Sequence, residues 1–242
     1  MQARMIDSDD APATLSPRIL LTGVRAGYRR GEDVLRAVDF ELAAGNIATF
    51  TGPSASGKSA LVDVLRLALT PTAGEAVILG EDARHLSWTL RAKLKRQIGY
   101  LAQDPRLVGH MTAFENVSLP LRLAGAKLDA YAADVEELLH FVGLPENDKR
   151  SAATMSGAER RRTAIARAVV GRPKIILAEE PVAGLSSDSA GRVLRLLATM
   201  RRAGSAVVVT TQDEALATEL GGAHWRLKDG RLALAAAGDR AA

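Results

Sequence analysis

The residues best suited to chemistry form a glycine-rich loop in the first quarter of the chain. They are Gly52, Pro53, Ser54, Ala55, Ser56, Gly57, Lys58 and Ser59, and they match the pattern G-x-x-x-x-G-K-[ST]. The glycines let the backbone curl into a nest of inward-facing N–H groups, and a following helix start adds partial positive charge. Lys58 can reach the β- and γ-phosphates, and the Ser59 hydroxyl can ligate Mg²⁺. The loop predicts binding of a nucleoside triphosphate; the alternative is a Gly/Ser-rich turn that only caps a helix.

Two consecutive carboxylates form a second candidate site. Glu179 and Glu180 directly follow the apolar segment 175–178. Ligands of a parallel sheet bind beyond the carboxyl ends of its strands, so both side chains are expected on the same rim as the phosphate loop. One carboxylate can hold the Mg²⁺ shell and the other can polarise the attacking water. The alternative is a solvated strand end without a chemical role.

The third candidate is the start of a helix at Ser156. Ser156 at the N-cap and Glu159 three residues later form a capping box around Gly157 and Ala158. Two interpretations stay open at this point. The segment is either a well-capped helix and nothing more, or a helix N-terminus that is presented to a phosphate.

Alternating strands and helices are expected to position these residues. Strands are predicted at 38–42, 47–51, 77–79, 98–101, 174–178 and 205–210, helices at 59–69, 128–142, 156–170 and 187–203, and a hairpin between 225 and 234. This alternation implies a parallel sheet covered on both faces. The segment of about 85–171 is helix-rich, and residues 1–17 and 235–242 are predicted to be disordered tails.

Composition excludes several other classes of protein. The 242 residues are 47% hydrophobic and 25% charged, which rules out disorder for the bulk of the chain. Cysteine is absent, so disulfides and thiolate zinc sites are excluded, and four histidines leave little for a metal cage. No apolar run is long enough to span a bilayer and no signal peptide is visible, which favours a cytosolic protein. The formal charge of +4 suits a nucleic acid, an anionic membrane or simply a solvated surface.

The order of these features resembles the ATP-binding cassette (ABC) ATPases over about residues 18–234. The matching features are the phosphate loop, Gln103, Ser156-Gly157, Glu179-Glu180, Gly184-Leu185 and Gln212. Within that family, the stretches 96–104, 115–126 and 165–170 are most similar to the FtsE cell-division branch. The lipoprotein-releasing and macrolide-exporting cassettes share parts of these stretches.

The resemblance implies a single ABC ATPase domain at 18–234, of the α/β P-loop NTPase class. Its mostly parallel RecA-like core sheet would carry an antiparallel β subdomain and an inserted helical subdomain at about 85–171. ATP and Mg²⁺ are the implied ligands. The segment implied to bind ATP runs from Gly52, the first residue of the phosphate loop, to Ala60. Tyr28 resembles the aromatic residue that stacks on adenine. Gln103 resembles the glutamine that approaches Mg²⁺ and leads to the surface gripping a membrane partner.

The remaining implied roles concern hydrolysis and dimerisation. Glu180 corresponds to the catalytic glutamate, Glu179 takes the metal-orienting aspartate position, and Gln212 takes the position of the switch histidine. The signature residues Ser156, Gly157, Ala158 and Glu159 would close over ATP held by the opposite subunit of a homodimer. This dimer would form on ATP binding.

Four positions depart from the family pattern. Ala158 replaces a glycine, Glu179 an aspartate, Ser186 an aspartate and Gln212 the histidine. A glutamine can hydrogen-bond a γ-phosphate but carries no positive charge. These departures predict slow hydrolysis, whereas phosphate binding needs none of the four positions.

The resemblance therefore predicts the ATP-hydrolysing subunit of an FtsE–FtsX-like complex in cell division. The chain would lie in the cytoplasm, held at the inner face of the cell membrane by an integral membrane partner resembling FtsX. The alternatives are the ATPase subunit of a lipoprotein-releasing or small-solute transporter, or an ATP-gated switch with little turnover. A nucleic-acid partner is not expected, because no aromatic-studded basic stripe is present.

Overall fold

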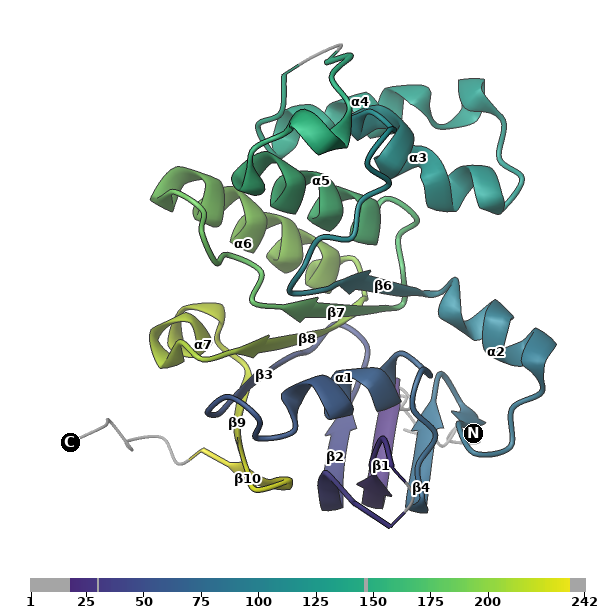
Figure 1. The fold of residues 1–242 in the computed structure, drawn as a ribbon, viewed down its shortest axis with the longest axis vertical. Helices are drawn as coiled ribbons and strands as arrows, with labels where there is room; N and C mark the ends of the chain where they lie inside the picture. Colours follow the sequence, from purple (N-terminus) through teal and green to yellow (C-terminus); the bar gives the residue numbers. More distant parts are fainter. Residues whose placement is uncertain (1–17, 30, 146–147, 236–242) are drawn as a thin grey trace, which may run out of the picture.

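The larger of two sheets forms the centre of the molecule (Figure 1). A computed structural model describes residues 18–29, 31–145 and 148–235. The central sheet has the strand order β10-β9-β3-β8-β7-β6. Its strands are β3 (Ile47–Thr51), β6 (Ile98–Leu101), β7 (Ile175–Glu179), β8 (Ala206–Thr211), β9 (Ala223–Lys228) and β10 (Arg231–Leu234). Its neighbouring strands are parallel, except that β9 and β10 form the predicted antiparallel hairpin.

A smaller antiparallel sheet lies below the central one in Figure 1, with α1 (Lys58–Leu65) between them. Its order is β2-β1-β4-β5, made of β1 (Ile19–Ala26), β2 (Leu35–Leu42), β4 (Ala73–Ile78) and β5 (Glu81–Asp82). Leu61 and Leu65 of α1 are fully buried in one apolar cluster with Ile19 and Phe50, which belong to the two sheets. This packing fixes the helix that follows the phosphate loop.

Helices cover the opposite face of the central sheet. α5 (Gly157–Val169) and α6 (Ser187–Arg202) lie next to the sheet, and α3 (Ala113–Leu123) and α4 (Ala132–Phe141) lie beyond α5 (Figure 1). Because side chains alternate along a strand, Ile175 and Leu177 of β7 join the cluster beneath the sheet, while Ile176 and Ala178 join the cluster above it. Burial on both faces explains the uninterrupted apolar run before Glu179. The α/β fold class, with a parallel core sheet, an antiparallel sheet and inserted helices, is confirmed.

Several elements were not predicted, among them β1, α3, α2 (Trp88–Lys95) and α7 (Glu214–Leu220). A register shift between Leu21 and Val24 interrupts the alternation of β1, and α3 contains Pro120. The helix predicted at 59–69 ends at Leu65, since Leu67 adopts a φ of +60°. The helix predicted at 128–142 begins instead as a 3₁₀ turn over Leu128–Ala130.

The predicted tails fall mostly outside the described residues, which exclude 1–17 and 236–242. Ala235 is described, and its amide donates to the carbonyl of His224 in β9. Within the described ranges, no helix combines the length and apolar character needed to cross a membrane.

Candidate active site

The phosphate loop connects β3 to α1 and is held by close backbone contacts. Gly52 has a φ of +156°, and a Cβ at this position would lie 2.2 Å from the Leu227 carbonyl oxygen of β9. Gly57 has a φ of +110° and forms the N-cap of α1. Side chains larger than hydrogen are therefore excluded at the first glycine by contact and disfavoured at the second by conformation. The two glycines set the course of the loop into the helix.

Lys58 lies over the loop that it follows. Its Nζ donates to the carbonyl of Gly52 at 2.5 Å and to that of Pro53 at 2.9 Å. Burial lowers the pKa of Lys58, and the charge of Glu180 partly opposes that effect. An ammonium group beside a helix N-terminus is suited to bind phosphate oxygens.

Ser59 and Glu179 form the candidate metal site. The Ser59 hydroxyl donates to Oε2 of Glu179 at 3.4 Å, and the buried Glu179 accepts a second hydrogen bond from Tyr100. The described residues contain no group of three or more His, Cys, Asp or Glu side chains able to hold a metal. Mg²⁺ at a nucleotide takes only one or two protein oxygens besides phosphates and waters, so this hydroxyl–carboxylate pair fits it.

Glu180 follows directly, and its carboxylate is held by two donors from the end of β8. Thr211 Oγ1 donates to Oε2 at 2.9 Å, and the Gln212 amide donates to Oε1 at 2.8 Å. The Gln212 side chain then reaches the phosphate loop, with Nε2 3.4 Å from Ser54 Oγ. The structure thus brings Glu180 and Gln212 to the loop, although they lie more than a hundred residues away along the chain. A carboxylate fixed at this position can accept a proton from water.

The backbone of Gln103 lies at the same edge of the sheet. Leu101 pairs with Ala178 in the parallel β6–β7 ladder, so Gln103 and Glu180 follow neighbouring strands at the same edge of the sheet. The Gln103 carbonyl accepts a hydrogen bond from Arg161 at 2.9 Å. Its side chain is exposed, and in the described part of the chain no hydrogen bond joins that side chain to Ser59 or Glu179. The expectation that it approaches Mg²⁺ stays a prediction.

Tyr28 lies at the surface beside α1. Its side chain is largely exposed, and its hydroxyl donates to Oδ2 of Asp63 at 2.7 Å. Partial burial and this hydrogen bond raise the pKa of Tyr28, so the hydroxyl stays protonated at neutral pH. The bond tethers the aromatic ring to the helix that begins at the phosphate loop, which is a suitable place for stacking on a base.

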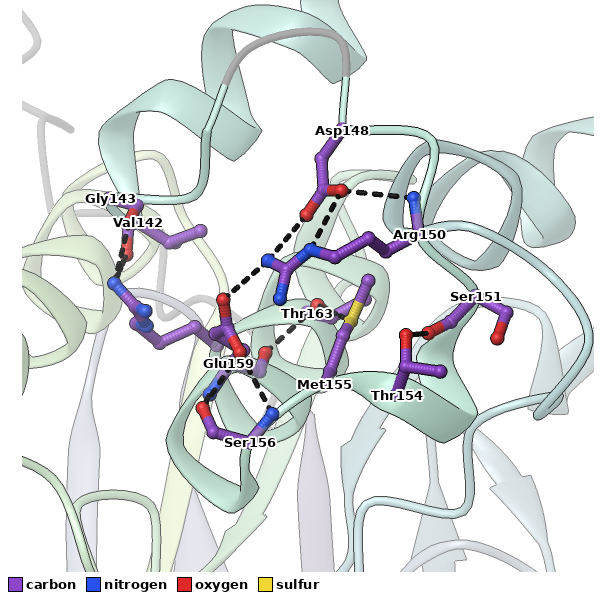
Figure 2. Close-up of polar contacts among 11 residues, drawn as sticks. Val142, Gly143, Asp148, Arg150, Ser151, Thr154, Met155, Ser156, Glu159 and Thr163 are labelled. Carbon is purple, nitrogen blue, oxygen red and sulfur yellow. Dashed lines mark hydrogen bonds and ion pairs between the residues drawn. The ribbon is translucent and has the colours of Figure 1, made fainter.

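The capping box at the start of α5 is present, and Figure 2 shows the contacts around it. The Glu159 amide donates to Ser156 Oγ at 3.2 Å, while Glu159 Oε2 accepts from the Ser156 amide and hydroxyl, each at 2.8 Å. Arg150 donates to Glu159 Oε1 at 2.6 Å and to Asp148 Oδ2 at 2.8 Å. Arg150, followed by the Ser156 backbone and hydroxyl, lowers the pKa of Glu159 to about 2.

The structure does not bring this helix start to the phosphate loop of the same chain. Within residues 18–29, 31–145 and 148–235, no hydrogen bond joins Ser156, Gly157, Ala158 or Glu159 to the segment 52–59. The expectation that they act on nucleotide held by a second copy stays a prediction.

Two site residues were missed by sequence reasoning, namely Tyr100 and Thr211. Tyr100 is one aromatic residue within a short strand, and Thr211 ends a β-branched run. Neither position carries a motif. The only signal for these two residues is the order of the strands in the sheet. That order places Tyr100 in β6 and Thr211 in β8, on either side of β7.

Comparison with known proteins agrees with this geometry. Residues 35–183 match the family model described as ABC transporter. The chain is 37% identical to the lipoprotein-releasing system ATP-binding protein LolD 1 of Caulobacter vibrioides, over 87% of this chain and 92% of that protein. It is 35% identical to LolD of Gluconobacter oxydans, over 91% and 97%.

A solved structure provides the third comparison. The ATP-binding cassette MJ0796, in a dimeric post-hydrolysis state bound to ADP and Pi, superposes with a TM-score of 0.82. It is 31% identical and matches over 88% of this chain and 96% of that one. Since the family model covers more than half of the chain and full-length relatives exceed 30% identity, the chain belongs to the ABC transporter family and is an ATP-binding cassette ATPase.

Proposed function

We propose that this chain is the ATP-hydrolysing subunit of a lipoprotein-releasing ABC transporter. The observation that carries the hydrolytic part is the convergence of Lys58, Glu180 and Gln212 at one edge of the central sheet. The relatives named LolD support the transport part. These relatives favour lipoprotein release over the expected FtsE–FtsX role in cell division, which none of the reported relatives supports.

The site residues would divide the work of hydrolysis. The loop amides and Lys58 bind the β- and γ-phosphates, and Tyr28 stacks on the base. Ser59 and Glu179 would hold Mg²⁺, which neutralises phosphate charge when bound. Glu180 accepts a proton from the attacking water, whose oxygen bonds to the γ-phosphorus as the bond to ADP breaks. Lys58 offsets the charge that develops on the phosphate oxygens.

Closure of a homodimer would couple this chemistry to a membrane partner. In that assembly, Ser156, Gly157, Ala158 and Glu159 of one copy cover the nucleotide bound by the other. The solved MJ0796 cassette is dimeric, which supports the arrangement. The chain would act at the cytoplasmic face of the membrane, docked on an integral membrane partner through the surface near Gln103.

An ATP-gated switch with little turnover is a second candidate. The position of Gln212 favours it, because a neutral amide stands beside Ser54 where the family pattern has histidine. ATP occupancy alone can set the state of a dimer if the two states differ in affinity for ATP.

Phosphate release by the purified protein separates these two candidates. Wild type and Glu180→Gln would be assayed at saturating Mg-ATP, with nucleotide binding measured in parallel. An active ATPase predicts at least about a hundredfold loss on substitution, with ATP binding retained. Equally low, near-background rates for the two proteins would favour the switch, and failure of both to bind Mg-ATP would exclude both candidates.

Reconstitution tests the substrate. The chain would be co-purified with its membrane partner, placed in proteoliposomes carrying a lipoprotein, and supplied with Mg-ATP. ATP-dependent release of lipoprotein that is lost with Glu180→Gln is expected. Stimulation of a cell-wall hydrolase without lipoprotein release would support the FtsE–FtsX role instead.

A further inference from the structure

Arg161 connects three parts of the site that are distant in sequence. It lies about one turn into α5, after the capping box at Ser156. One guanidinium nitrogen donates to the carbonyl of Glu180 at 2.9 Å, and the other terminal nitrogen donates to the carbonyl of Gln103 at 2.9 Å. A single planar group thus bridges the loops that follow β6 and β7.

The backbone of Glu180 adopts a conformation that needs support. Its φ is +45°, which is unusual for a residue with a side chain, and Pro181 follows it. A residue held in such a region is strained and persists only where its surroundings impose that conformation. The Glu180 amide donates to Thr210, and its carbonyl accepts from the Ala183 amide and from Arg161. Among the described residues, only Arg161 contacts this carbonyl through a side chain.

We infer that Arg161 is a positioning residue for hydrolysis. Its guanidinium fixes the main chain of Glu180, and therefore the direction of the Glu180 carboxylate, relative to Gln103 and to the start of α5. A displacement of α5 would move both loops together, because the planar fork is rigid. The inference rests on the proposed role of Glu180 in accepting a proton from water.

The geometry requires arginine in particular. Two carbonyls on different loops accept from different nitrogens of one guanidinium, whereas the compact ammonium group of lysine lacks this fork. Lysine would keep the positive charge and lose the bridge. Arg161→Lys therefore separates positioning from simple electrostatic attraction.

Arg167 provides a matched control on the same helix. Its guanidinium donates to the carbonyls of Pro105 and Arg106 at 2.8 and 3.1 Å, and so anchors the segment after Gln103. In the described part of the chain, no hydrogen bond joins Arg167 to Glu180. Arg167→Gln removes an arginine and a loop anchor from α5 and leaves the Glu180 contact in place.

Steady-state kinetics and thermal unfolding test the inference. Arg161→Gln and Arg161→Lys are expected to lower kcat at least tenfold and to leave KM for Mg-ATP within threefold of wild type. Arg167→Gln should keep kcat within threefold. A raised KM with unchanged kcat would overturn the inference, as would an equal kcat loss in Arg167→Gln. Arg161→Lys is expected to fold with a near-native Tm. A kcat that falls only in proportion to the loss of folded protein would also overturn the inference.

A double variant isolates the link to Glu180. If Arg161 acts through that carboxylate, Arg161→Gln added to Glu180→Gln lowers the residual rate by less than twofold. Multiplied losses would show an independent role and overturn the inference. Should Glu180→Gln hydrolyse ATP like wild type, the proposed role of Glu180 fails and the inference fails with it. Should Glu180→Gln be inactive while Arg161→Gln is fully active, only the inference fails.

Discussion

The hydroxyl of Tyr100 donates a hydrogen bond of 2.5 Å to Oε1 of Glu179, which leaves Oε2 of the same carboxylate facing Ser59. Burial and this bond raise the pKa of Tyr100, so the hydroxyl remains a donor at neutral pH. The Arg66 guanidinium lies 4.9 Å from the centre of the Tyr100 ring. Glu179 is one methylene longer than the aspartate of the family pattern, and Tyr100 directs that longer side chain toward Ser59.

Removal of this hydroxyl is expected to weaken metal binding. Tyr100→Phe keeps the ring and leaves one oxygen of a buried carboxylate without a donor, a loss worth about 1–3 kcal/mol. We expect the Mg²⁺ concentration for half-maximal ATP hydrolysis to rise about tenfold, measured by titration at saturating ATP. Tyr28→Phe also loses one hydroxyl bonded to a carboxylate, and it should leave the Mg²⁺ requirement unchanged. An unchanged requirement in Tyr100→Phe would show that Ser59 alone orients Glu179.

Tyr28 permits a test of base stacking. Tyr28→Ala should weaken ATP binding about tenfold, because stacking of a base on an aromatic side chain contributes about 1–3 kcal/mol. Tyr28→Phe keeps the ring, loses only the bond to Asp63, and should bind within about threefold of wild type. Titration calorimetry with ATP and with triphosphate alone distinguishes the base from the phosphates. Equal losses for the two ligands would contradict a stacking role.

The central sheet and the phosphate loop could be predicted because their signals are local. Gly52, Gly57 and Lys58 lie within one short segment, and their types are dictated by backbone conformation and charge. The strand before Glu179 is an uninterrupted apolar run because both of its faces are buried. In both cases the signal lies in residues that are adjacent in the sequence.

Other features depend on contacts between distant segments. β1 has a broken alternation because Gly23 lies in a bulge, where its amide donates to Asp39 of β2. α3 continues through Pro120, and one turn earlier the buried Asn116 anchors the helix to the preceding loop through the carbonyls of Val108 and Met111. The bond from Tyr100 to Glu179 exists because β6 pairs with β7, and the spacing of neither segment reveals that pairing.

Gln212 is expected to limit the rate of hydrolysis. Its backbone amide already holds Glu180, so a substitution can change the side chain beside Ser54 without removing that contact. Gln212→His restores the family residue and adds a side chain that can carry positive charge near the phosphates. We expect kcat to rise about tenfold, equivalent to ~1.4 kcal/mol of barrier. Phosphate release at saturating ATP measures it, with Gln212→Ala as the control that only removes the amide. A rate for Gln212→His equal to that of Gln212→Ala would show that this position does not limit turnover.

Glu159 should make the start of α5 sensitive to acid. Its pKa falls from about 4.3 in unfolded chains to about 2 in the folded protein, chiefly through Arg150. A lowered folded-state pKa gives stabilisation that is complete above the unfolded value and is lost as the pH falls through the folded value. The relevant window therefore runs from about pH 5 down to about pH 2.

Comparison with Glu159→Gln isolates this effect from other carboxylates that titrate in the same window. Urea unfolding near pH 7 should show wild type more stable by about 1 kcal/mol, a modest value because the Arg150 side chain is 46% exposed. That difference should shrink steadily as the pH is lowered toward 2, since a protonated Glu159 carries no more charge than the glutamine that replaces it in the variant. A difference that stays constant with pH would mean that the ion pair with Arg150 does not stabilise the helix start. The capping box would then depend on its hydrogen bonds to Ser156 alone.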